Sequence, residues 1–248
     1  MKPKVAFFDF ASCEGCQLQV VNLEEKILDL VDIVEVVSFR EAMKEHSDGY
    51  DIAFIEGSIM RPMDEERLKK IRSHAKLLVA LGACACIGGV NKLRNKWPVA
   101  DVKAEVYGTA ALDGNPYFDV LPTRAVDEVV AVDAHVPGCP INRNEFAKTV
   151  TSLAFGRKPR LPNYPVCVEC KKNENVCLFE RGQFCLGPIT RAGCNSICPT
   201  NGEGCDGCRG FLEDLRVNAM KDVLRRHNVS MDQMLKRFNL YNYRREGY

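Results

Sequence analysis

The stretch KVAFFDFASCEGCQLQ, residues 4–19, begins the pattern from which the fold is predicted. Its first part is apolar and rich in phenylalanine, which predicts a β-strand over residues 4–10 that is buried on both faces. Cys13 and Cys16 follow where this strand gives way to a predicted helix. Two thiols at such a turn are poorly placed to act as a structural cross-link, so we expect them to hold a ligand.

The rest of the N-terminal part repeats this alternation of apolar runs and helix-like segments. Buried parallel strands read as nearly continuous apolar runs, so the pattern predicts an α/β fold with a doubly wound parallel sheet. Strands are expected at 4–10, 32–38, 51–57, 76–83 and 128–136, and helices at 17–30, 40–46, 64–74 and 142–155. The segment 88–124 has no clear assignment.

Composition limits the classes of partner. The chain has 248 residues, 46% of them hydrophobic, and a net charge of +1, which gives no general reason to expect nucleic acid or a membrane surface as partner. No apolar run approaches the roughly 20 residues of a membrane span. The N-terminus enters the first predicted strand without the pattern of a secretory signal. We therefore expect a cytoplasmic protein.

A second region begins near the proline-rich segment RKPRLPNYP, residues 157–165. Eight cysteines lie between Cys167 and Cys208 with little apolar periodicity, and residues 211–248 look helical. The predicted organisation is a domain over 1–156 and a smaller, irregular cluster-binding domain over 157–248, which ends in a helical tail.

The thirteen cysteines indicate metal binding. Disulfides are rare in a reducing compartment, and the count is odd. One set of four follows the carboxyl ends of predicted parallel strands, where open α/β sheets bind their ligands. Four thiolates that meet there suit a 4Fe-4S cluster or a structural zinc ion. This set is Cys13, Cys16, Cys84 and Cys139.

The second region supplies two further sets of four, and Cys86 is left over as a small core residue. One set is Cys167, Cys170, Cys177 and Cys185, and the other is Cys194, Cys198, Cys205 and Cys208. Structural zinc sites use local cysteine pairs in small domains that lack a core. The first set spans a fold that needs no such support, which favours iron-sulfur clusters over zinc without excluding zinc.

Five motifs together resemble the small subunit of nickel-iron hydrogenases. They are CEGC at 13–16, IEGS at 55–58, GACACIGG at 82–89, PGCP at 137–140 and CLFERGQFCLGPITRAGC at 177–194. The resemblance implies a flavodoxin-like domain that holds a proximal cluster, followed by a domain with two more clusters. It implies a proximal set of Cys13, Cys16, Cys84 and Cys139, a medial set of Cys194, Cys198, Cys205 and Cys208, and a distal set of Cys167, Cys170, Cys177 and Cys185.

Two positions differ from many members of this family. Many members have a histidine at the position of Cys167. Many also have a proline near the position of Cys198, which leaves them with a 3Fe-4S medial cluster. A full 4Fe-4S medial cluster is therefore expected here, giving three 4Fe-4S clusters. The pattern is similar to cytoplasmic groups coupled to nicotinamide, deazaflavin or ferredoxin, among them sulfhydrogenase.

The resemblance also implies that this chain and a partner subunit have different roles. The family's nickel-iron centre is bound by cysteines of a large subunit, so this chain is expected to relay single electrons between that partner and a flavin or iron-sulfur acceptor subunit. Glu14 is a candidate proton relay, or only a carboxylate that favours a helix N-terminus. Glu56 is a candidate interface or ligand-supporting carboxylate. The four histidines fit no ligand set: His46, His74, His135 and His227.

Three other interpretations stay open. The related small subunit of respiratory complex I shares the α/β domain but has one cluster and a tandem-cysteine motif, which the eight later cysteines contradict. The chain could also serve another oxidoreductase as its iron-sulfur electron-transfer subunit. A zinc-stabilised interaction protein is the third.

Overall fold

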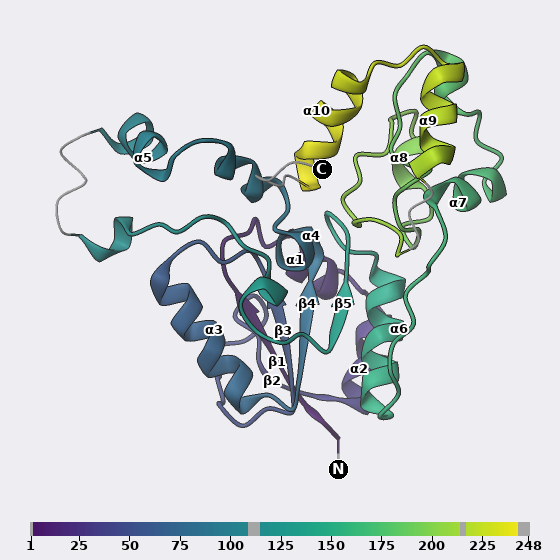
Figure 1. Ribbon diagram of the computed structural model, residues 1–248. Coiled ribbons are helices and arrows are strands. Elements are labelled where there is room, and N and C mark those ends of the chain that lie inside the picture. The colour runs from purple at the N-terminus through teal and green to yellow at the C-terminus, as the bar shows by residue number, and fades with distance from the viewer. Residues whose placement is uncertain (1, 109–114, 214–216, 243–248) are drawn as a thin grey trace.

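The N-terminal part of the chain is a five-stranded parallel sheet (Figure 1). The computed structural model describes residues 2–108, 115–213 and 217–242. The strand order is β2-β1-β3-β4-β5, which is the flavodoxin-like order and confirms the predicted fold class. The strands are β1 (Lys4–Asp9), β2 (Glu35–Ser38), β3 (Ile52–Glu56), β4 (Leu77–Leu81) and β5 (Ala134–Val136).

Both faces of the sheet are buried, because alternate side chains enter two separate cores. In β3, Phe54 packs into one core and its neighbour Ile55 into the other. The first core lies under α2 (Lys26–Ile33) and α6 (Arg143–Ala154), and the second lies under α3 (Pro62–His74). This explains why the strands read as continuous apolar runs.

Three expectations about elements need correction. Residues 40–46 form a turn instead of a helix, since only Ala42 and Met43 donate amides to the Phe39 carbonyl, and one turn is too short to propagate. The segment expected as a helix over 17–30 is two helices, α1 (Gly15–Val21) and α2. The strand expected over 128–136 is only β5, preceded by η4 (Val126–Glu128).

The unassigned segment 88–124 extends outward from the sheet (Figure 1). It contains η1 (Val90–Lys96), α5 (Val99–Tyr107) and η3 (Pro116–Phe118). It begins after α4 (Gly82–Ile87), the short helix at the carboxyl end of β4.

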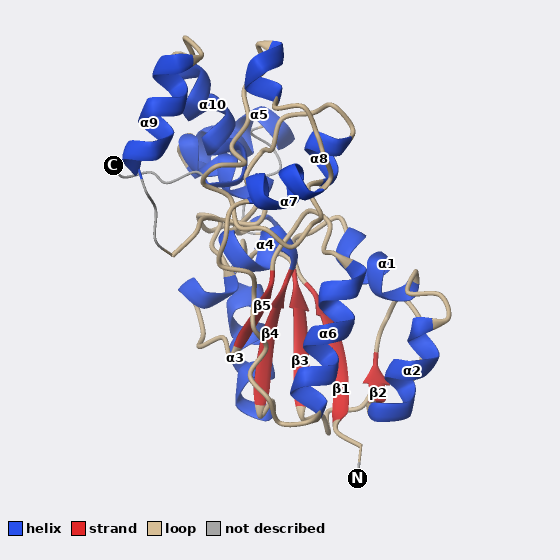
Figure 2. Cartoon of the chain, turned by 90° about the vertical axis from the view of Figure 1, so that its right-hand side faces the viewer, coloured by secondary structure: helices blue, strands red, loops and turns tan. Residues whose placement is uncertain are grey.

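The C-terminal part lies beyond the carboxyl ends of the strands, where the arrowheads in Figure 2 point. It contains α7 (Val166–Lys172), η5 (Leu178–Arg181), α8 (Ile197–Thr200), α9 (Val217–Arg226) and α10 (Met231–Asn242). Long irregular segments connect these helices, and the division into two domains at residue 156 stays a prediction. Within the part of the chain that the structure describes, no helix has the length and apolarity of a membrane span.

Candidate iron-sulfur sites

The proximal set lies at the carboxyl edge of the sheet. Cys13 follows β1, Cys16 lies in α1, Cys84 lies in α4, and Cys139 follows β5. Cys139 and Cys13 help to raise the pKa of Cys84, and Cys139 and Cys84 help to raise that of Cys16, so the four thiols lie near one another. The structure therefore brings four residues from four distant segments together, as the order of the strands predicts.

Burial controls the chemistry of these thiols. It raises the pKa of Cys84 to about 12, and the neighbouring Cys139 and Cys13 add to the effect. Burial also raises the pKa of Cys16. Without positive charge nearby these groups would stay protonated at neutral pH, whereas metal ligands are thiolates. Gly82 has a φ of 84°, and a Cβ there would collide with the Cys16 Sγ, so the turn between β4 and α4 requires glycine.

Glu56 supports the proximal set through the backbone of α1. It is 2% exposed at the end of β3, and its carboxylate accepts the amides of Cys16 (3.1 Å) and Gln17 (2.9 Å). Burial raises the pKa of Glu56, and these two amides oppose the shift. Glu56 thus fixes the start of the helix that carries Cys16.

Glu14 stands at the start of α1 in a left-handed conformation with a φ of 60°. Partial burial raises its pKa, and the nearby carboxyls of Glu41 and Asp9 raise it further. Its role in proton transfer stays a prediction.

The distal set gathers around α7. Cys167 and Cys170 lie in this helix, Cys177 precedes η5, and Cys185 lies in the following loop. Burial raises the pKa of Cys167 to about 12, and Cys185, Cys170 and Cys177 all contribute. The Cys185 Sγ accepts the Gly187 amide at 3.3 Å. Amide donors of this kind stabilise a sulfur that carries negative charge.

The medial set lines a single cavity of about 340 Å³. Its four thiols come from the loop before α8, from α8 itself and from the segment after it. The same cavity reaches Cys139 of the proximal set and Tyr241 of α10. The medial residues in its wall are Cys194, Cys198, Cys205 and Cys208.

Two contacts join neighbouring sets. The Cys205 amide, in the medial set, donates to the Cys185 Sγ of the distal set at 3.2 Å. The backbone of Cys139, in the proximal set, hydrogen-bonds the Cys208 thiol of the medial set. Cys13 and Cys139 at one end, and Cys177 at the other, are exposed. The medial set therefore lies between two sets that each reach the surface.

The donors fit iron-sulfur clusters. Each set offers four cysteines, which is the ligand set of a 4Fe-4S cluster, and the medial four surround a cavity. Within residues 2–108, 115–213 and 217–242, no three histidine, cysteine or carboxylate side chains are drawn together tightly enough to hold one metal ion.

Four polar side chains at these sites were not anticipated from the sequence. Arg209 and Tyr241 line the medial cavity, Glu145 of α6 pairs with Arg209, and Glu169 of α7 accepts amides of the medial loop. Arg209 directly follows a cysteine ligand candidate, which is a weak signal in the sequence. Tyr241 lies in the C-terminal helix, and no local pattern indicates that this helix returns to the sites.

The remaining cysteine and the histidines are engaged elsewhere. Cys86 is in the core and its Sγ contacts the Ala80 carbonyl at 3.5 Å, as expected for a small core residue. His46 bonds Ser38, and His74 bonds the Lys70 carbonyl. His135 faces Asp127, and His227 stacks on Phe179.

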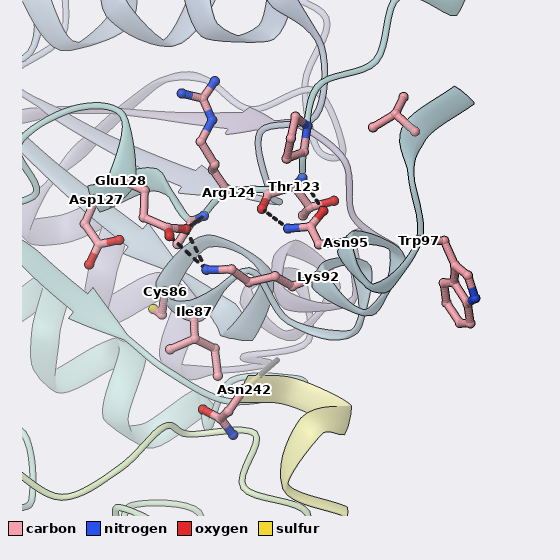
Figure 3. A pocket seen from close by; sticks show the side chains of 13 residues that line it. Cys86, Ile87, Lys92, Asn95, Trp97, Thr123, Arg124, Asp127, Glu128 and Asn242 are labelled. Carbon is pink, nitrogen blue, oxygen red and sulfur yellow. Dashed lines mark hydrogen bonds and ion pairs between the residues drawn. The ribbon is translucent and has the colours of Figure 1, made fainter. Parts of the chain in front are cut away.

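A larger cavity of about 740 Å³ lies apart from the three sets, and Cys86 is the cysteine among the residues that line it (Figure 3). Its polar groups largely bind one another: Lys92 Nζ pairs with Glu128 at 2.8 Å, and Asn95 exchanges two 2.8 Å hydrogen bonds with the Thr123 backbone. It does not belong to the cluster sites.

Comparison with known proteins identifies the family. The family model described as NADH ubiquinone oxidoreductase, 20 Kd subunit, matches residues 13–153. Sulfhydrogenase 2 subunit delta of Pyrococcus furiosus is 36% identical over 224 residues, which cover 90% of this chain and 92% of the relative. The crystal structure of an NAD+-reducing [NiFe]-hydrogenase in the H2-reduced state matches with a TM-score of 0.59 and 28% identity, covering 65% of this chain and 96% of that one. The chain belongs to the family of nickel-iron hydrogenase small subunits.

Another relative supports the same family, and a more distant solved structure shares the fold. A vhu subunit of the F420-non-reducing hydrogenase of Methanocaldococcus jannaschii is 30% identical, and the match covers 96% of this chain and 94% of the relative. An actinobacterial-type NiFe-hydrogenase from Ralstonia eutropha, 15% identical with a TM-score of 0.60, shares the fold over 96% of this chain and 90% of its own. The motif-based resemblance is confirmed, and this small subunit is part of a hydrogenase, an oxidoreductase complex. The model named for the 20 Kd subunit matches only the part before the eight later cysteines.

Proposed function

We propose that this small subunit carries electrons through three 4Fe-4S clusters, held by the proximal, medial and distal sets. The observation that carries the proposal is the cavity of about 340 Å³ whose wall contains all four medial cysteines, with the proximal Cys139 beside them. Bound clusters would accept and release one electron each, at potentials that the surrounding protein sets.

The order of the sets supports a linear path. The proximal and distal sets reach the surface through Cys13, Cys139 and Cys177, while a contact links the medial set to each of them. A carrier between two partners needs one exposed end for each partner. The protein's part is to hold the sulfurs, exclude water and supply amide donors to them.

The partner at the proximal end, in this proposal, is a hydrogenase large subunit that holds the nickel-iron centre. Twelve of the thirteen cysteines are committed to the three sets, and Cys86 is buried in the core. The chain thus lacks the four thiolates that the family's nickel-iron centre uses. The distal end would meet a flavin or iron-sulfur acceptor subunit, and a cytoplasmic location stays a prediction.

The experiment is to compare the chain alone with its complex. A tagged small subunit, expressed with the neighbouring genes and purified without oxygen, should retain a large subunit and show hydrogen-dependent bleaching of its iron-sulfur absorbance. The same chain stripped of partners should bind iron but take up no hydrogen. Hydrogen uptake by the partner-free chain would contradict the assignment, and so would clusters in the complex that hydrogen does not reduce.

A further inference from the structure

Arg209 is a buried cation at the junction of the proximal and medial sets. Its side chain is 1% exposed and makes four contacts. The Nη1 donates to the Pro137 carbonyl at 2.6 Å, and the Nη2 to Glu145 Oε1 at 2.7 Å. The Nε donates to the Ala192 carbonyl at 2.9 Å and lies 3.2 Å from the Arg191 carbonyl.

These contacts tie together the loops that carry ligands of both sets. Pro137 is two residues before Cys139, Ala192 is two residues before Cys194, and Arg209 directly follows Cys208. A planar guanidinium with fixed donors can hold several such groups in one geometry, whereas a lysine cannot.

The backbone around Arg209 is adapted to it. Gly193 has a φ of 121°, and a Cβ there would collide with the Arg209 Nη2 and lie 2.6 Å from Glu145 Oε1. The loop that leads to Cys194 therefore packs directly on the ion pair. A residue that served only to neutralise Glu145 on α6 would not need contacts with two further loops.

We propose that Arg209 is a positioning residue, which fixes the proximal loop against the medial set and, through its charge, raises the reduction potential of the medial cluster. This inference rests on the proposed function, because it requires that both clusters are present. With clusters bound, the transfer that it governs would move one electron between the proximal and medial clusters and would exchange no atoms.

The charges around Cys194 support the electrostatic part. Arg209 directly follows Cys208, and its Nε donates to the carbonyl of Ala192, two residues before Cys194. Glu169 Oε2 lies 3.9 Å from the Cys194 Sγ, and the carboxylate also accepts the amides of Gly193 (2.8 Å) and Ser196 (3.1 Å). A cation near the ligands favours the reduced, more negative cluster, and an anion disfavours it. Arg209 and Glu169 should therefore act in opposite directions.

The test compares three variants of the whole complex by redox titration with electron paramagnetic resonance. The medial signal is assigned as the one that Cys198→Pro alters. Arg209→Met combined with Glu145→Gln removes the cation without leaving a buried carboxylate unpaired. Arg209→Lys keeps the positive charge but loses the planar guanidinium that binds several groups at once. Glu169→Gln removes a negative charge and is the matched change of opposite sign.

The variants should shift the reduction potential of the medial cluster in different directions. Arg209→Met/Glu145→Gln removes one positive and one negative charge, and it should make reduction of the medial cluster severalfold less favourable, because the cation directly follows the ligand candidate Cys208 whereas Glu145 lies on α6. Glu169→Gln should make it more favourable. Arg209→Lys should leave the reduction potential of the medial cluster near the wild-type value. It should change the magnetic interaction between the proximal and medial clusters, because the guanidinium no longer holds the loops together.

Two results would overturn the inference. One is a medial potential that stays at the wild-type value in both the Arg209 double variant and Glu169→Gln. The other is a shift in the same direction in both, which a general loss of packing would produce. If the double variant fails to assemble, the sign of the Glu169→Gln shift and the Arg209→Lys spectrum decide the question. Absence of iron from the wild-type protein would instead refute the proposed function.

Discussion

Cys198 is the residue that most distinguishes the proposed medial site. Its thiol lines the cavity together with Cys194, Cys205 and Cys208. Cys198→Pro should remove one ligand and convert the medial cluster from 4Fe-4S to 3Fe-4S, with a higher potential. The substituted residue is in the first turn of α8, where proline is tolerated, so the fold should persist. Electron paramagnetic resonance of the oxidised variant should detect a new 3Fe-4S signal.

The matched control is Cys86→Ala. Cys86 is also a buried cysteine, but it is a residue of α4 that packs into the hydrophobic core, and it belongs to none of the three sets. Cys86→Ala should leave the iron content and the electron paramagnetic resonance spectrum unchanged. An unchanged medial signal in Cys198→Pro would show that Cys198 is not a ligand.

Glu56 gives a second prediction for a single residue. Its two carboxylate oxygens accept the amides of Cys16 and Gln17 separately, so Glu56→Gln keeps an acceptor for only one of them and turns an NH2 donor toward the other. The start of α1 should lose about 1–3 kcal/mol of local stability, because leaving a buried amide without an acceptor costs about that amount. Hydrogen exchange of the peptide that contains both amides should speed up several-fold.

Glu66→Gln in α3 is the control for this change, since Glu66 is an exposed carboxylate. It should leave the exchange of that peptide at the wild-type rate. Equal exchange in Glu56→Gln and the wild type would mean that the carboxylate does not secure α1.

The turns between elements carry the proximal site. Gly82, between β4 and α4, has a positive φ and almost touches the Cys16 Sγ, whereas Gly156, after α6, has a positive φ of 65° and open space around it. Gly82→Ala and Gly156→Ala therefore share a backbone strain of about 1–2 kcal/mol. Only Gly82→Ala should also displace Cys16 and lower the iron content by about one cluster of four iron. Iron analysis of both variants tests this, and an equal loss in both would refute the steric argument.

The elements differ in how well the sequence predicts them. The strands were predictable because the sheet is covered on both faces, so that Phe54 and Ile55 are both apolar although they face opposite ways. Residues 40–46 have helix-forming side chains, but the segment is too short, and Ser38 and His46 pair across the turn instead. Propensity alone cannot foresee such a tertiary contact.

At the scale of the whole molecule, the cysteine positions were predictable and their supporting side chains were not. Strand order brings Cys13, Cys84 and Cys139 to one edge, so chain topology alone indicates a common site. Arg209 reaches Glu145 across 64 residues and the Pro137 carbonyl across 72. Those contacts depend on how the C-terminal part packs on the sheet, which has no local signature in the sequence.

The same packing explains the linear order of the proposed relay. The irregular C-terminal part lies over the carboxyl edge of the sheet (Figure 2). The medial cavity reaches Cys139 of the proximal set, and the Cys205 amide contacts Cys185 of the distal set. Electrons would thus enter and leave at different surfaces of the molecule.

The most direct test of this account is iron and acid-labile sulfide analysis of the anaerobically purified complex. Three sets of four cysteines predict about twelve iron and about twelve sulfide for each copy of this chain, in addition to any metal of its partners. A chain with almost no iron or sulfide and about three zinc ions would contradict the account, because four-cysteine sites also suit structural zinc.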